Sequence, residues 1–235
     1  MAFFQESGRS REPILNAPPV VTWLIGALLT AHFLRYLASD TVNQDILLCL
    51  AFIPARVSGG LVGGISLGGV LALLAPFVTH IFLHGSIPHL IINCAWLLAF
   101  GPGVARRLGA PRFLSFFFLC GIVAALTHLV LYWGAAELMV GASGAVAGLM
   151  GAGMRILYGS RAIPFVPHPP LAPLSARPIV LFTVSWVGMN MLFAFTSLGL
   201  SDAPIAWAAH LGGYVIGLLG IAAFDPATKV PATPV

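Results

Sequence analysis

Charged side chains are scarce in this sequence. Asp, Glu, Lys and Arg make up only 8% of its 235 residues, whereas 59% are hydrophobic, and soluble domains carry about 25% charged residues. Too little polar surface remains to face water on all sides, so we expect one membrane domain with lipid as its main surroundings. The net charge of +4 comes without a basic patch, so nucleic acid is not an expected partner.

Cysteine is also rare. Cys49, Cys94 and Cys120 show no CxxC spacing, and the last two lie inside apolar runs. This pattern indicates small hydrophobic side chains rather than a disulfide or a metal site. We therefore expect all three cysteines to be buried.

Long apolar runs predict six membrane-spanning helices, since a span needs roughly 20 apolar residues. The run at 20–37 is long for a signal peptide and has Arg35 and Tyr36 where a cleavage site would need small residues, so it is interpreted as a retained first span. In chain order the expected spans are 20–37, 88–100 with its flanks, 113–133, 143–158, 179–198 and 205–224.

A seventh apolar run, at 61–83, is rich in glycine and contains Pro76 and His80. If it also crossed the bilayer, the arginine clusters at 106–112 and 155–177 would move outside, against the positive-inside rule. We therefore expect this run to be a membrane-embedded outer loop that does not cross.

The same charge pattern predicts how the chain is divided. Residues 1–17 and 226–235 are expected to be cytoplasmic tails, and residues 18–225 a single membrane domain. The proline-rich segment 164–173 is expected to be an inner linker between the fourth and fifth spans.

Ser143 is the first candidate for chemistry. It begins the fourth span in the sequence GASG, where free N–H groups and the helix dipole favour negative charge. Twelve residues separate it from Arg155, roughly 18 Å of helix, whereas the hydrocarbon core of a membrane is ~30 Å thick. With Arg155 near the inner boundary of that core, Ser143 lies well below the outer boundary. A serine at that depth implies a water-filled cavity open to the outside. The alternative is an N-cap serine on a small-residue packing helix.

His210, in the sixth span, is the expected partner of Ser143. It lies eight residues after Asp202 of the outer loop, roughly 12 Å into the membrane, and ionisable groups at such depth usually have a function. Gly213 and Gly217 share its helix face. Ala147 and Gly151 follow Ser143 at +4 and +8, and we expect these two small-residue faces to bring the fourth and sixth spans close together. The alternative is a structural histidine bonded to a carbonyl.

No acidic residue completes a catalytic triad. Asp202 lies about two turns from His210, and Glu137 lies six residues before Ser143. The sequence therefore predicts a Ser143–His210 dyad, with the histidine oriented by packing. Gly141 and Gly144 are expected to keep the serine accessible and, with Gly213 and Gly217, to allow close helix packing at the site.

The second span carries further polar residues. His89 and Asn93 form an i, i+4 pair and could stabilise an oxyanion together with the Ser143 backbone N–H; an interhelical hydrogen bond is the alternative for Asn93. His80 and His84 have a spacing that can bind metal, but no carboxylate is near. We expect no metal, and we expect these two histidines to tie the outer loop to the domain.

These motifs together resemble the rhomboid protease family. The matching segments are HGSIPHLIIN at 84–93, GPGVARRLG at 101–109, GASG at 141–144 and AHLGGYVIG at 209–217. Residues 54–56 (PAR) also look like the arginine-bearing part of the family's first outer loop. The resemblance covers residues 20–224.

The resemblance implies an all-α, six-helix membrane protein, a serine endopeptidase that cleaves transmembrane protein substrates with a Ser143–His210 dyad and no cofactor. It implies oxyanion roles for His89 and Asn93, and substrate entry past the fifth span, where Phe182 and Trp186 are candidate gate residues by position. By analogy it implies a bacterial inner membrane. Ala147 departs from family members that place an aromatic residue there against the catalytic imidazole.

Three other functions stay open at this stage. One is a proteolytically silent, rhomboid-like protein that binds membrane clients. Another is a transporter that uses the intramembrane histidines, although the two halves show no internal repeat. The third is a metal-dependent membrane enzyme built on His80, His84 and His89.

Overall fold

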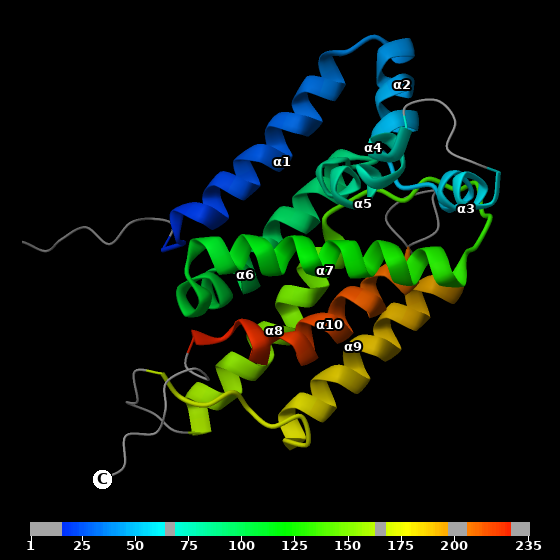
Figure 1. Cartoon of the computed structure of the whole chain (residues 1–235). Helices are drawn as coiled ribbons and strands as arrows, with labels where there is room; N and C mark the ends of the chain where they lie inside the picture. The colour runs from blue at the N-terminus through cyan, green and yellow to red at the C-terminus, as the bar shows by residue number, and fades with distance from the viewer. Residues whose placement is uncertain (1–15, 64–68, 163–167, 197–205, 227–235) are drawn as a thin grey trace, which may run out of the picture.

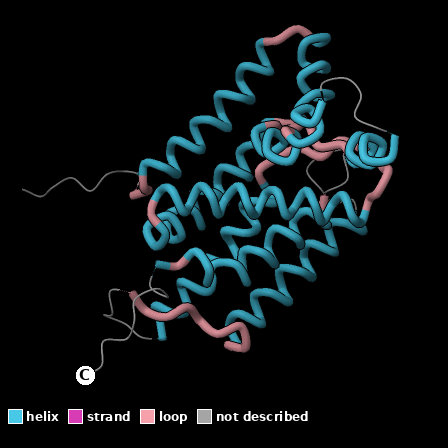
Figure 2. Tube along the Cα trace, in the orientation of Figure 1, coloured by secondary structure: helices cyan, strands magenta, loops and turns pink. Residues whose placement is uncertain are grey.

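The computed structural model describes residues 16–63, 69–162, 168–196 and 206–226, and in these ranges the regular structure is entirely helical (Figures 1 and 2). This agrees with the predicted all-α class. The longer helices are α1 (Pro19–Leu37), α6 (Ile87–Leu108), α7 (Ala110–Leu131), α8 (Ser143–Ala162), α9 (Arg177–Thr196) and α10 (Trp207–Phe224). The shorter ones are α2 (Asp40–Leu50), α3 (Pro54–Gly63), α4 (Gly69–Leu74), α5 (Pro76–Thr79) and the 3₁₀ turn η1 (His80–Phe82).

Among the described residues, four helices are long and apolar enough to cross a membrane. They are α1, α6, α7 and α10, and the chain is therefore a multi-pass membrane protein. The helices α8 and α9 have 20 residues each, which gives each a length of about 30 Å. Both begin within two residues of the starts predicted from the sequence.

The helix α8 lies at the centre of the bundle, behind α7 and α10 in Figure 1. It packs on α6, α7, α9 and α10, and its residues 144–152 are all buried. Glycine and alanine dominate this stretch, so neighbouring helices can approach its backbone closely. A helix enclosed in this way needs no lipid-facing apolar side.

The apolar run 61–83 does not form one long helix. Its described part consists of the end of α3, then α4, α5 and η1, and the apolar stretch Gly69–Phe82 is shorter than a span. Residues 64–68 lie outside the described residues. Thr79 Oγ1 donates a hydrogen bond to the Leu50 carbonyl at 2.7 Å, so this segment is folded back against the end of α2.

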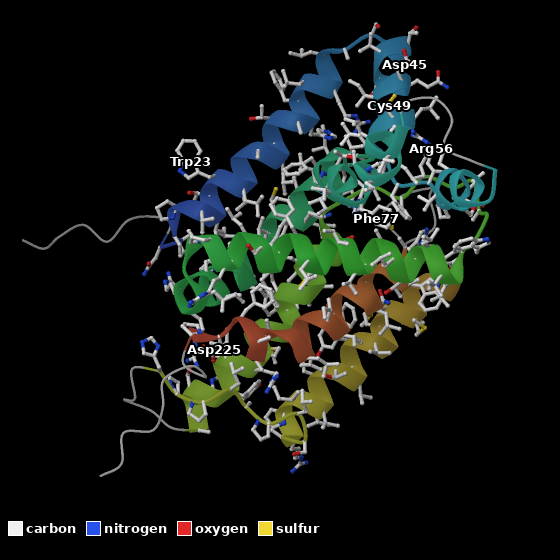
Figure 3. The ribbon with its side chains drawn as sticks, in the orientation of Figure 1. Trp23, Asp45, Cys49, Arg56, Phe77 and Asp225 are labelled. Carbon is white, nitrogen blue, oxygen red and sulfur yellow. The ribbon has the colours of Figure 1, made fainter. Side chains whose placement is uncertain are left out.

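Two arginine side chains form hydrogen bonds and an ion pair at the end of the bundle where α6 and α10 terminate. Arg107 donates to both carboxylate oxygens of Asp225 at 2.8 and 2.7 Å and to the Pro169 carbonyl at 2.8 Å. Figure 3 shows Asp225 just beyond α10. Arg155 donates to the carbonyls of Ala172 and Leu218, both at 3.0 Å. The described part of the proline-rich linker therefore packs against the domain.

The prediction that all three cysteines are buried is confirmed for Cys120 only. Cys120 is buried and Cys94 half-buried, but Cys49 is exposed, because α2 extends away from the bundle and has no buried residue (Figure 3). The exposed apolar residues of α1 suit contact with lipid; Trp23 is 78% exposed and points away from the other helices.

Candidate active site

The segment that leads into α8 fixes where Ser143 lies. Met139 and Phe52 exchange backbone hydrogen bonds of 2.8 and 3.0 Å, and the Gly141 N–H donates to the His80 carbonyl at 2.9 Å. The Ala142 N–H points to Nε2 of His84 at 3.5 Å. These bonds come from the backbone of Phe52 and His80 and from the ring of His84. They tie the segments around 52 and 80–84 to the start of α8.

Ser143 and His210 come together as the sequence predicted. The serine Oγ lies 2.7 Å from Nε2 of the imidazole, although 67 residues separate the two in the chain. Both residues are half-buried. Ser143 is the first residue of α8, and His210 lies in the first turn of α10.

A third polar residue completes this arrangement. Oδ1 of Asn190 lies 3.0 Å from Nδ1 of His210, and Nδ2 of Asn190 donates to the Trp207 carbonyl at 3.0 Å. The Asn190 side chain is 7% exposed. Sequence reasoning missed it, although a lone asparagine inside the apolar run 179–198 was a usable signal, because polar groups inside a span are costly.

No acid was expected to complete a triad. Glu137 is exposed, and Asp202 lies outside the described residues. The partner of Nδ1 is thus an amide, where the sequence predicted orientation of the histidine by packing alone.

The His89 side chain, on α6, lies against Gly141 in the segment 139–142 that leads into α8. A Cβ atom at Gly141 would lie 2.8 Å from both Cε1 and Nε2 of His89, and φ at Gly141 is +118°. Both the ring and the backbone conformation therefore require glycine at this position. Gly141 precedes α8, so the close approach that it allows is to the His89 ring of α6 and not between two helix backbones.

Asn93 lies one turn further along α6 and is buried. Its Nδ2 donates to the His89 carbonyl at 2.9 Å. This bond lies within one helix, so it differs from the interhelical bond that was the structural alternative.

Glycines hold α8 and α10 at backbone contact. A Cβ atom at Gly213 would overlap the Gly144 carbonyl oxygen, and one at Gly217 would overlap that of Gly148. The contact face of α8 is therefore Gly144, Gly148 and Gly151. Ala147 belongs to a different face and packs with Tyr214, whose ring stacks on Trp186 of α9 with centroids 4.4 Å apart.

Within the described ranges no group of three His, Cys, Asp or Glu side chains is arranged to hold a metal ion. Nδ1 of His80 donates to the Pro76 carbonyl at 2.8 Å. The His84 ring packs edge-on to that of His89, with centroids 5.1 Å apart.

In this arrangement the serine hydroxyl is hydrogen-bonded to one nitrogen of an imidazole, and the other nitrogen is hydrogen-bonded to a third residue. Such an arrangement activates a serine as a nucleophile. The first N–H groups of α8 lack partners within the helix and lie next to the serine oxygen. The His89 ring is close to the same point, since a Cβ atom at Gly141 would lie 2.8 Å from its Nε2 and 3.8 Å from Ser143 Oγ. Such an arrangement can supply a nucleophile, a base and donors for a developing negative charge.

The Rhomboid domain matches residues 71–225, about two thirds of the chain. The chain belongs to the rhomboid family, as the sequence motifs indicated. The matched range contains Ser143, His210, Asn190, His89 and Asn93.

Curated relatives agree with this assignment. The chain is 34% identical over 146 residues to the rhomboid protease GlpG of Serratia proteamaculans (strain 568), an alignment that covers 61% of this chain and 45% of the relative. It is 33% identical over 148 residues to the rhomboid protease GlpG of Yersinia pestis (strain Pestoides F), again covering 61% and 45%. The alignments thus span about half the length of these relatives.

Proposed function

We propose that this protein is an intramembrane serine endopeptidase that cleaves transmembrane protein substrates. The observation that carries the proposal is the 2.7 Å contact between Ser143 Oγ and His210 Nε2, because a serine is a poor nucleophile until a base removes its proton. Membership of the rhomboid family and similarity to proteins named rhomboid protease support it.

In the proposed reaction, Nε2 of His210 takes the proton from Ser143 Oγ while that oxygen attacks a substrate carbonyl. Ser143 N–H, His89 and Asn93 hold the oxyanion of the tetrahedral intermediate. His210 then gives its proton to the leaving amine, and the acyl-enzyme is hydrolysed by a water that His210 deprotonates. These steps call for no cofactor and no metal.

The proposed topology has six crossing helices: α1, α6, α7, α8, α9 and α10. Both ends of the chain then lie in the cytoplasm and the segment 61–83 lies in the outer leaflet, within a domain spanning residues 18–225. The clustering of arginines at the ends of α6 and α8 supports this orientation. A bacterial inner membrane is the proposed location, by analogy with the relatives.

Transmembrane substrates are proposed to enter between α9 and the rest of the bundle. The helix α9 carries exposed apolar residues along its length, Val180, Leu181, Val184, Met189 and Leu192. Trp186 and Phe182 are the proposed gate residues, since both pack beside buried Tyr214, where α9 meets α10.

The test is cleavage of a reporter in proteoliposomes. The reporter is a single transmembrane helix with small, helix-destabilising residues near its outer end, and it is offered to wild type, Ser143→Ala and His210→Ala. We expect cleavage by wild type alone. Binding of the reporter without cleavage by folded wild type would instead support a silent, client-binding protein.

A further inference from the structure

Asn190 is a buried polar side chain in a membrane helix, and the proposed reaction gives it no step. Its amide spans two partners on α10, the Trp207 carbonyl and the His210 ring, each at 3.0 Å. Burying a polar side chain inside a membrane domain is costly unless its hydrogen bonds are satisfied. Polar residues found there often have a function. Both of the bonds found here end within the first turn of α10.

The Trp207 carbonyl fixes which way the Asn190 amide points. A carbonyl oxygen can only accept, so the atom facing it must be the Nδ2 donor. Trp207 is itself held in place, because its Nε1 donates to Tyr132 Oη at 2.7 Å. Oδ1 of Asn190 therefore faces the imidazole.

This orientation decides the protonation of His210. Oδ1 can only accept, so Nδ1 of the ring must carry the hydrogen, and a neutral imidazole has only one. Nε2 then presents its lone pair to the Ser143 hydroxyl at 2.7 Å. That is the tautomer that can take the serine proton.

We propose that Asn190 is a positioning residue that holds His210 in this tautomer and ring orientation; the inference rests on the proposed function for its catalytic consequence. The same bond strengthens when His210 becomes positively charged, because hydrogen bonds to an ionised group are stronger than neutral ones. It therefore supports both the resting base and the imidazolium that forms during the reaction.

In the described part of the chain the His210 ring bonds to Ser143 and to Asn190, and nothing shown on the neighbouring helices replaces the Asn190 bond. On α8, Ala147 offers only a methyl group and is 2% exposed. The aromatic cluster of Tyr214, Trp186 and Phe182 lies between α9 and α10. Orientation of the histidine thus depends on a side chain from α9, the helix proposed to border substrate entry.

The test compares wild type with Asn190→Ala, Asn190→Asp and Thr183→Val, all full-length and reconstituted. Aspartate keeps an oxygen for the Nδ1 hydrogen, whereas alanine removes it. Thr183→Val is the matched control, because it removes a different bond between α9 and α10, the 2.8 Å contact of the Thr183 and Tyr214 hydroxyls, without touching His210. ¹⁵N NMR of histidine-labelled protein reports the tautomer, with His210 assigned by its absence in His210→Ala.

Above the pH range in which histidine ordinarily titrates, we expect His210 to be protonated on Nδ1 in wild type, Asn190→Asp and Thr183→Val, and to become a tautomer mixture in Asn190→Ala. We expect kcat for the reporter to fall about tenfold or more in Asn190→Ala, with KM nearly unchanged and with recovery in Asn190→Asp, since acid–base catalysis contributes about 10²–10⁴-fold.

An unchanged tautomer in Asn190→Ala would overturn the inference, and so would equal losses of kcat in the alanine and aspartate variants. If the wild type shows the expected tautomer but neither cleaves the reporter nor reacts with a fluorophosphonate probe at Ser143, the proposed function is contradicted. In that case the NMR comparison still decides the role of Asn190 as the residue that orients His210.

Discussion

The backbone of Gly213 lies so close to the carbonyl oxygen of Gly144 that a Cβ atom would overlap it. Each glycine is near a residue of the proposed dyad, Gly144 directly after Ser143 and Gly213 three residues after His210. The distance between the serine and the histidine therefore depends on contact between two glycines.

Gly213→Ala should both destabilise the protein and reduce cleavage. Forcing a methyl group into a packed contact costs about 1–3 kcal/mol, and the resulting shift of α10 would lengthen the Ser143–His210 hydrogen bond. The measurements are the unfolding midpoint in detergent and the cleavage rate. Gly188→Ala on α9 is the control, since a methyl group there would meet no neighbouring helix or side chain within 4 Å; an equal effect of the two substitutions would contradict the account.

Gly141→Ala should remove activity while leaving most of the stability intact. Alanine is strained at a φ of +118°, and its methyl group would displace the His89 ring, 2.8 Å away. The measurement is kcat for the reporter beside the unfolding midpoint. Gly103→Ala, in the same helix as His89 and with open space around it, should retain wild-type kcat. Normal activity in Gly141→Ala would show that neither the loop conformation nor the His89 ring matters for the reaction.

Ala147 and Tyr214 should be energetically coupled. Both are buried, at 2% and 1% exposure, in one cluster with Met150, so phenylalanine at position 147 would collide with the tyrosine ring. We expect Ala147→Phe to be destabilising alone and to be relieved by Tyr214→Ala, with a coupling of about 0.5–3 kcal/mol in a double-mutant cycle. Strictly additive effects on the free energy of unfolding would mean that the two side chains do not share this space.

Arg107→Leu should be strongly destabilising. It leaves the Asp225 carboxylate, 1% exposed, without its bidentate arginine, and breaking a buried pair by removing one partner costs about 3–5 kcal/mol. The double variant Arg107→Leu/Asp225→Leu should recover part of this loss, because the buried carboxylate that lost its arginine is gone. Chemical unfolding in detergent measures both; a double variant less stable than Arg107→Leu would argue against the explanation.

Much of the helical framework was predictable because hydropathy and arginine placement are strong signals in a membrane protein. The expected start of the fourth span at Ser143 coincides with the start of α8. The second span was predicted at 88–100 with its flanks, and the helix there, α6, runs from Ile87 to Leu108 through Pro102. The run at 61–83 was correctly excluded as a single spanning helix, since a crossing there would have reversed the arginine clusters.

Features that depend on tertiary contacts were harder to predict. The hydropathy of residues 179–198 predicts a spanning helix, but it does not predict that Asn190 faces His210. The small-residue face of α8 was expected to follow Ser143 at Ala147 and Gly151. Gly151 does contact the α10 backbone, but Gly144 and Gly148 do so as well and Ala147 packs on the Tyr214 side, because the rotation of a helix against its neighbour is set by the packing of both. Charge patterns predicted only that the proline-rich linker lies on the inner side of the membrane. They did not predict its contacts with Arg107 and Arg155.

The central claim is that Ser143 is an activated nucleophile, and the most direct measurement is its reaction with a fluorophosphonate probe. Purified wild type, Ser143→Ala and His210→Ala are treated with the probe, and the modified residue is located by mass spectrometry. The account predicts an adduct on Ser143 in wild type and none in either variant. A folded wild type without an adduct at Ser143, or equal labelling of His210→Ala, would contradict it.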